Sequence, residues 1–468
     1  MTAPSIDLSE NRDVTAALLL EPLAWRVRAV EHLEVDSDST CIRRRSLQCG
    51  PLRSVLSEHV ELGEAQSAFL VLNVATLPRA LLFDFDVQGP GGTSAFLLSR
   101  TEIAAREVHF LCQMAARAGL SVPSQLLPFL EAMVGMTDAP WGKEGPPSNL
   151  TGIAEFIRSG IGDPGESLLS NWMALSDEVH ELLSSRTEGP GPYTPVEQPV
   201  LAIPDLFNIV EIRALDEVTA VLEGYRNLVR AAQAGSNMDR PTDADDFLNS
   251  LADYGRHYEM LVDVDVPLDR PFVIEYSERR PMKLSWRNRG YQDLVIADAQ
   301  SNHVSLRVTD PNVRIRDLTI RTPDRKDVAY GIFRILETNQ AQTFYAYDRD
   351  RDYRVAVRFH VAPLWRLSFV PYTVLLVIVA LTVALVHEGL HTLKDLALIV
   401  GPSAIAASVL AAREPTTLGS RLRRMSTLAL AVALAVMLAV AAGEYVHGNL
   451  SASVARVVDL GGRAARLV

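Results

Sequence analysis

Hydrophobic and polar residues alternate with a period of two through much of residues 256–365. The clearest run, residues 353–361, has Tyr, Val or Phe at each odd position and Arg, Ala or His at each even position. Successive side chains of a β-strand point to opposite faces, so this pattern is typical of a strand with one buried face. Similar runs, such as residues 258–266 and 304–308, predict about seven to nine short strands. We therefore expect an antiparallel β-sandwich over residues 256–365.

The chain before this region mixes strand and helix patterns. Residues 68–74, 81–87 and 95–98 are strand-like, with a turn between the last two. Ser99 and Glu102 then form a predicted capping box, and the helix after it is expected to end before Gly119.

Two further helices are predicted, at about residues 216–234 and after Thr242, because apolar residues recur there three or four positions apart. Breaks rich in Pro and Gly lie at residues 138–147 and 188–199. The fold class expected is α+β, and the predicted organisation has four parts: an N-terminal α+β region at 1–135, a mainly helical region with Pro/Gly-rich linkers at 136–255, the sandwich at 256–365 and a transmembrane region at 366–468.

The last part contains three long uncharged apolar runs, at about residues 367–386, 396–412 and 425–443. A helix of about 20 residues spans the roughly 30 Å hydrocarbon core of a bilayer, so we predict three transmembrane helices. The middle run contains Gly401-Pro402, which leaves two alternatives open, a kinked complete span and a re-entrant segment. Trp365, Arg366 and Tyr372 are expected to anchor the first span at the interface.

The distribution of charge separates the two halves of the chain and predicts their orientation. Residues 366–468 carry nine basic and five acidic residues, a net charge of +4, whereas residues 1–365 carry 36 basic and 52 acidic residues, a net charge of −16. Residues 413–424 contain four arginines, and residues 387–395 contain only Lys394 as a basic residue. Positive loops stay in the cytoplasm. We therefore predict a multi-pass plasma-membrane protein with a cytoplasmic N-terminal part.

The N-terminus and the tail add two expectations about targeting. The first residues lack the basic and long apolar segments of a signal peptide. The tail, residues 452–468, is expected to form an interfacial helix that breaks near Gly461-Gly462.

Composition also limits the partners. A net charge of −12 argues against nucleic acid, whose phosphates need clustered positive charge. The predicted partners are the lipid bilayer and an unknown protein or small molecule on the cytoplasmic side. Small residues at helical spacing in spans 2 and 3 also allow close packing, within one chain or as a homo-oligomer; these are Ala404, Ser408, Ala412, Ala431, Ala435 and Ala439.

One short motif suggests chemistry, the sequence His387-Glu388-Gly389-Leu390-His391. On a helix, His387 and His391 share a face and can bind zinc, and Glu388 can act as general base. Glu444 and His447, at the end of the third span, are further candidate ligands. The segment resembles the motif of zinc metalloproteases, and its setting is similar to that of site-2-type proteases, but no partner motif is found in a later span.

We therefore expect a multi-pass membrane protein with a large cytoplasmic binding, sensing or scaffolding module, with no enzymatic activity and no cofactor. The alternative is a membrane zinc metallohydrolase that uses residues 387–391. The soluble part, on the opposite face of the membrane, could not present a substrate to that site.

Overall fold

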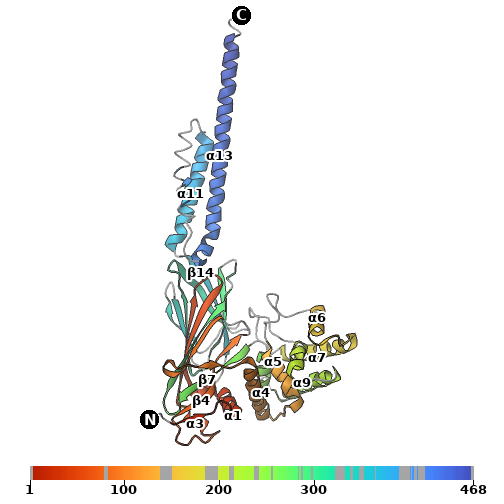
Figure 1. The fold of residues 1–468 in the computed structure, drawn as a ribbon. Helices are drawn as coiled ribbons and strands as arrows, with labels where there is room; N and C mark the ends of the chain where they lie inside the picture. The colour runs from red at the N-terminus through yellow and green to blue at the C-terminus, as the bar shows by residue number, and fades with distance from the viewer. Residues whose placement is uncertain are drawn as a thin grey trace.

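The structure is a computed structural model with a mixed α+β fold and several β-sheets (Figure 1). It describes residues 4–78, 83–136, 150–184, 199–209, 215–236, 242–254, 257–282, 284–285, 288–296, 299–321, 332–337, 341–346, 353–363, 365–388, 401, 403–404, 408 and 417–464.

Fourteen described strands form the β-domain, and they lie in two separate parts of the chain. The first part contributes β1 (Ser5–Asp7), β2 (Arg26–Val35), β3 (Thr40–Cys49), β4 (Ser67–Pro78), β5 (Phe83–Gln88) and β6 (Phe96–Leu97). The second contributes β7 (His257–Pro267), β8 (Phe272–Pro281), β9 (Arg289–Ile296), β10 (Ser301–Val308), β11 (Val313–Arg321), β12 (Ile332–Glu337), β13 (Ala341–Ala346) and β14 (Tyr353–Pro363).

These strands pair into three sheets. The largest has seven strands in the order β12-β13-β10-β2-β3-β8-β5, and the others have the orders β1-β4-β7-β6 and β11-β14-β9. Most pairs are antiparallel, but β1 pairs with β4 and β2 with β10 in parallel. Short helices α1 (Arg12–Leu20), α2 (Pro22–Trp25) and α3 (Arg53–Leu56) connect the first strands.

The sheets do not follow the predicted domain boundaries. Strand β3 lies between β2 and β8 and pairs with β8 over ten residues, from Thr40 opposite Pro281 to Cys49 opposite Phe272. Strand β4 pairs with β7 in the same way. Residues 1–135 and 256–365 therefore contribute strands to the same sheets, and the helical region is an insertion between β6 and β7. A period-two pattern identifies a strand but contains no information about its partner, which is why the boundaries differ.

Two apolar cores hold the sheets together. In the first, side chains of β4 and β7, such as Leu72 and Val262, pack against β2, β3 and β8. In the second, Val357 and Phe359 of β14 pack against β2 and β10. The seven-stranded sheet therefore supports the four-stranded sheet along one part of its length and the three-stranded sheet along another.

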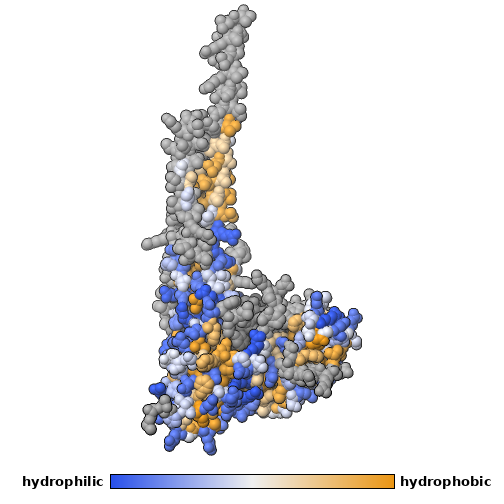
Figure 2. All heavy atoms as spheres, in the orientation of Figure 1, coloured by the Kyte–Doolittle hydropathy of each residue, from blue (hydrophilic) through white to orange (hydrophobic). Residues whose placement is uncertain are grey.

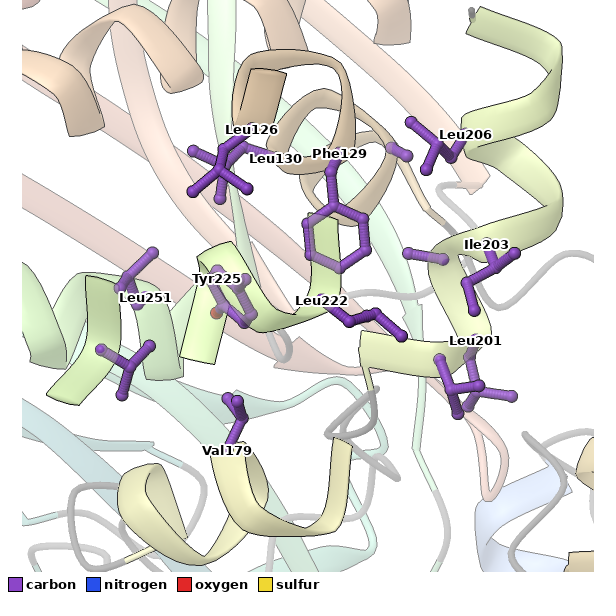
Figure 3. Packing of buried hydrophobic residues seen from close by; sticks show 14 of the residues in the cluster. Leu126, Phe129, Leu130, Val179, Leu201, Ile203, Leu206, Leu222, Tyr225 and Leu251 are labelled. Atoms are coloured by element: carbon purple, nitrogen blue, oxygen red, sulfur yellow. The ribbon is translucent and has the colours of Figure 1, made fainter. Parts of the chain in front are cut away.

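The inserted helices have a core of their own. They are α4 (Arg100–Arg117), α5 (Leu127–Gly135), α6 (Leu150–Ile161), α7 (Glu166–Ser184), α8 (Ile203–Ile209), α9 (Leu215–Gly235) and α10 (Asp243–Tyr254). Figure 3 shows side chains from several of these helices meeting around Phe129 and Tyr225, whose rings pack edge to face at 5.4 Å. The Ser99–Glu102 capping box is present, and the helices predicted at 216–234 and after Thr242 are confirmed as α9 and α10.

Helix α4 fastens this insertion to the β-domain. Arg106 Nη2 donates to the carbonyl of Ser9 at 2.6 Å. The neighbouring Glu107 is fully buried, and its Oε1 accepts a hydrogen bond of 2.7 Å from the backbone N–H of Glu259 in β7. Because one turn of α4 contacts both chain segments of the β-domain, the two domains are joined by buried polar contacts.

Two long helices leave the β-domain side by side and in the same direction, α11 (Trp365–Glu388) and α13 (Thr417–Ala464) (Figure 1). Their contact is apolar and centres on Ile378, Leu430, Met437 and Ala441. Figure 2 shows apolar residues along α13, giving way to mainly hydrophilic residues at the adjoining end of the β-domain.

By length and composition, the described residues include one helix that could cross a membrane, α13, in its segment Thr427–Glu444. Helix α11 contains a shorter apolar segment, Tyr372–Ala384. Helix α13 is 48 residues long and continues through Gly461-Gly462, so the break predicted there is wrong. Its helical hydrogen bonding to Ala464 shows that two glycines do not end a helix that is already formed, although each lowers its helix propensity by about 1 kcal/mol relative to alanine.

Candidate functional site

The residues predicted to bind a metal lie at the end of α11 and a little beyond the middle of α13. His387 and Glu388 are the last two residues of α11. Glu444 and His447 lie within α13. The remaining predicted ligand, His391, lies outside the described residues, as do Gly389 and Leu390.

Helices α11 and α13 run side by side, and on each of them these residues lie beyond the apolar contact between the two helices. The apolar contact between the helices extends to Leu381 on α11 and to Ala441 on α13. His387 follows the end of that contact by about two turns, and Glu444 and His447 follow it by one to two turns. The side chains of His387 and His447 are exposed, and that of Glu444 is half-buried. Among the described residues, no three His, Cys, Asp or Glu side chains gather closely enough to hold a metal ion.

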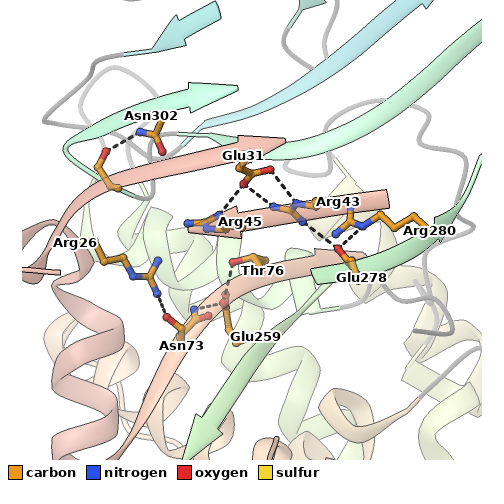
Figure 4. Close-up of polar contacts among 11 residues, drawn as sticks. Arg26, Glu31, Arg43, Arg45, Asn73, Thr76, Glu259, Glu278, Arg280 and Asn302 are labelled. Carbon is orange, nitrogen blue, oxygen red and sulfur yellow. Dashed lines mark hydrogen bonds and ion pairs between the residues drawn. The ribbon is translucent and has the colours of Figure 1, made fainter. Parts of the chain in front are cut away.

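A second set of charged residues, which the sequence did not predict as a site, lies inside the β-domain. Glu31 of β2, Arg43 and Arg45 of β3, and Glu278 and Arg280 of β8 form this ionic layer (Figure 4). Each residue of the layer is no more than 4% exposed. Because β2, β3 and β8 are adjacent strands, their inward-facing side chains meet in one row across the seven-stranded sheet.

The contacts of the ionic layer are short and centred on Glu31. Arg43 donates from Nε and Nη2 to the two oxygens of Glu31, at 2.8 and 2.6 Å. Arg45 Nη1 donates to the same carboxylate at 2.9 Å. Glu278 accepts from Arg280 Nε at 2.5 Å and from Arg43 Nη1 at 3.5 Å. Arg43 therefore links the two carboxylates, and its first pair has the bidentate geometry that makes arginine–carboxylate contacts strong.

The layer separates the two apolar cores of the β-domain. Along the inner face of β3, Cys41 belongs to one core and Leu47 and Cys49 to the other, with Arg43 and Arg45 between them. The alternation of buried and exposed residues is unbroken through these arginines. In the sequence, the period-two pattern of β3 continues through Arg43 and Arg45, with apolar residues before and after them. That pattern is the signal from which the ionic layer could have been predicted.

The electrostatics of the layer favour the charged form of Glu31. Burial acts to raise the pKa of Glu31, but the guanidinium groups of Arg43 and Arg45 outweigh it and lower the pKa below its usual value. The guanidinium of Arg43 also lies over the ring of Tyr276, 5.5 Å from its centroid, as in a cation–π contact. Since every group in the layer is sealed from solvent, its chemistry is that of a structural ion network and not that of a site open to substrate.

A smaller polar network lies beside the layer. Arg26 Nη2 donates to the carbonyl of Asn73 at 2.7 Å, and the amide of Asn73 donates to the carboxylate of Glu259. Thr76 Oγ1 donates to the same carboxylate at 2.8 Å. This network joins β2, β4 and β7, and through the backbone of Glu259 it reaches α4 of the insertion.

Comparison of the chain with protein-family models and with curated proteins finds no match. The functional assignment therefore depends on the geometry of this chain alone.

Proposed function

We propose that this chain is a multi-pass plasma-membrane protein whose β-domain and helical insertion form a cytoplasmic binding, sensing or scaffolding module without catalytic activity. In this proposal, the membrane-proximal sandwich expected at residues 256–365 is part of the β-domain, which also contains strands β1–β6. The observation that carries the proposal is that both long apolar helices are anchored in the β-domain.

The two anchors are of different kinds. Helix α11 begins at Trp365, directly after β14 ends at Pro363, so the first anchor is covalent. The second is made by the first turns of α13, where Leu418 is fully buried in the core that contains Val357 and Phe359. Arg421 pairs with Asp38 at 3.2 Å and donates to the carbonyl of Leu284 at 2.5 Å.

The two anchors support the proposal that the chain crosses the membrane three times. Helix α11 is 24 residues long and therefore ends about 36 Å from the β-domain. Because α13 starts again at the β-domain, the chain between them has to return over the same distance, which fits a second span at residues 396–412. Ser408, in this stretch, has a helical contact in which its hydroxyl donates to the carbonyl of Ala404. The contact of Arg421 with Asp38 also indicates that the arginine-rich loop and the β-domain lie on the same side of the membrane.

Cysteine labelling tests this topology. In a Cys112→Ser background, we expect Thr392→Cys to react with a membrane-impermeant maleimide in intact cells, and Ser420→Cys to react only after the membrane is opened. The native Cys41 and Cys49 should not react with the maleimide, because both side chains are buried and burial raises the pKa of each thiol to about 12. Labelling of position 420 but not of 392 in intact cells would contradict the proposal.

The proposed partners are the bilayer, a protein or small molecule on the cytoplasmic side and a second copy of the chain, and not nucleic acid. The small residues Ala431, Ala435 and Ala439 of α13 are all exposed, away from the contact with α11, which supports their availability for close packing. Native mass in mild detergent would separate an oligomer from a monomer.

The alternative function is a membrane zinc metallohydrolase, and one observation favours it: His387 on α11 and Glu444 and His447 on α13 all lie beyond the apolar contact between these two adjacent helices. In that case His387, His391 and one of Glu444 or His447 would bind zinc, and Glu388 would act as general base. The purified chain would then contain stoichiometric zinc that is lost in His391→Ala and kept in His32→Ala, an exposed histidine of β2. Absence of zinc from the purified wild-type chain, even after exposure to it, would remove this alternative.

A further inference from the structure

The three-stranded sheet β11-β14-β9 has one face in the apolar core and one face turned outward. Val357, Phe359 and Val361 of β14 point into the core. The residues between them therefore face outward, together with the residues opposite them on β9 and β11. His360 lies opposite both Arg289 and Arg316, and Ala362 lies opposite Arg314.

This outer face carries an excess of positive charge. Arg289 and Arg316 are exposed and Arg314 is half-buried, and we call these three residues the arginine face. Arg358 lies on the same side of the sheet, one row further from the membrane region. Among the residues that the structure describes, no carboxylate forms an ion pair with any member of the arginine face. The soluble part has a net charge of −16, so a local excess of arginine runs against its composition.

Two acidic residues at the same end of the β-domain already have arginine partners of their own. In the turn between β2 and β3, Asp38 pairs with Arg421 at 3.2 Å. Asp36 pairs with Arg279 at 3.5 Å. Asp36 and Asp38 are therefore engaged with other arginines and are not the counter-ions of the arginine face. Like charges placed close together on a sheet are unfavourable, so they favour binding of an external anion.

The position of the arginine face, close to the start of α11, indicates which anion it binds. Arg314 is opposite Ala362, which precedes the start of α11 at Trp365 by three residues, or about 10 Å along the strand. Arg289 and Arg316 lie opposite His360, two residues before Ala362 on β14, and so about 7 Å further from the start of α11. The first row is thus within about a Debye length, roughly 8–10 Å, of the level at which the apolar helices enter the bilayer.

We propose that the arginine face binds the anionic phospholipid headgroups of the leaflet that faces the β-domain. This inference rests on the proposed membrane topology. Planar guanidinium groups bind phosphate through paired N–H donors, and basic residues held near a membrane surface attract anionic lipids electrostatically. The face gives the β-domain a lipid-dependent third contact with the membrane, in addition to the anchors at β14 and at Arg421.

The test uses the full chain, purified in mild detergent and stripped of lipid, then mixed with equal amounts of phosphatidylglycerol and phosphatidylcholine. Native mass spectrometry reads the bound lipid. We expect phosphatidylglycerol adducts to exceed phosphatidylcholine adducts by at least about tenfold, since each arginine near a membrane surface favours anionic lipid by about fivefold. The triple variant Arg289→Gln, Arg314→Gln, Arg316→Gln should lose most of this preference.

A control variant carries the same change of charge elsewhere. Arg12, Arg270 and Arg307 are exposed and lie outside the three-stranded sheet, so their replacement by Gln should leave the preference intact. Equal adducts of both lipids on the wild-type chain would overturn the inference, as would an unchanged preference in the arginine-face variant. Full displacement of the lipid by inorganic phosphate alone, or by a soluble acidic peptide, would also overturn it, because the partner would then not be a lipid.

Flotation with phosphatidylcholine vesicles separates this inference from the proposed function. If the topology holds and the inference fails, all variants float with the vesicles but none prefers phosphatidylglycerol. If the chain does not insert into membranes at all, the wild type and both variants fail to float.

Discussion

Replacement of Glu31 by alanine is expected to lower the free energy of unfolding of the β-domain by about 3–5 kcal/mol, which is the usual cost of removing one partner from a buried ion pair. Glu31 accepts hydrogen bonds from both Arg43 and Arg45 and is 3% exposed. Its loss leaves two guanidinium groups buried without their shared carboxylate. A loss of this size is a large part of the 5–15 kcal/mol that stabilises a typical domain.

A matched control lies three residues away on the same strand. Glu34 also pairs with an arginine of β3, Arg44, at 2.8 Å, but the side chains are 22% and 55% exposed. Exposed pairs contribute about 0–1 kcal/mol, so Glu34→Ala should be nearly neutral. Urea unfolding of the full chain in detergent, followed by tryptophan fluorescence, measures both variants. Similar midpoints for Glu31→Ala and the wild type would mean that the ionic layer does not stabilise the β-domain.

Val357→Asp is expected to disrupt the three-stranded sheet and with it the attachment of both long helices. Val357 is fully buried on the central strand β14, in the same core as Leu418 of α13. An unpaired carboxylate in such a core costs several kcal/mol. Limited proteolysis of the full chain in detergent should therefore cleave the variant within residues 289–363 much faster than the wild type.

The control for this variant is Thr319→Asp. Thr319 is exposed on β11 and lies opposite Arg358, on the outer face of the same sheet. A carboxylate there remains in water and is close to a positive charge, so digestion should proceed as in the wild type. If the two aspartates increase cleavage equally, the assignment of Val357 to the buried face is incorrect.

The sequence alone determined the elements whose signals are local. The capping box at Ser99 places the start of α4, since it depends on residues three positions apart. The strict alternation at 353–361 places β14 and its buried face, since side-chain direction follows from the period of a strand. The apolar runs at 367–386 and 425–443 place α11 and the middle of α13, since about 20 apolar residues in succession favour one long helix.

Tertiary structure alone decided how these elements combine. The pairing of β3 with β8, whose residues are more than 200 positions apart in the chain, leaves no trace in the local pattern, and it overturned the separation of residues 1–135 from 256–365. The same pairing buries Arg43 and Arg45, which composition would place on the surface, because carboxylates from two neighbouring strands meet them there. The row formed by Arg289 and Arg316, which both lie opposite His360, arises in the same way. Local periodicity fixes which way a side chain points, but only the packing of distant segments decides what it meets.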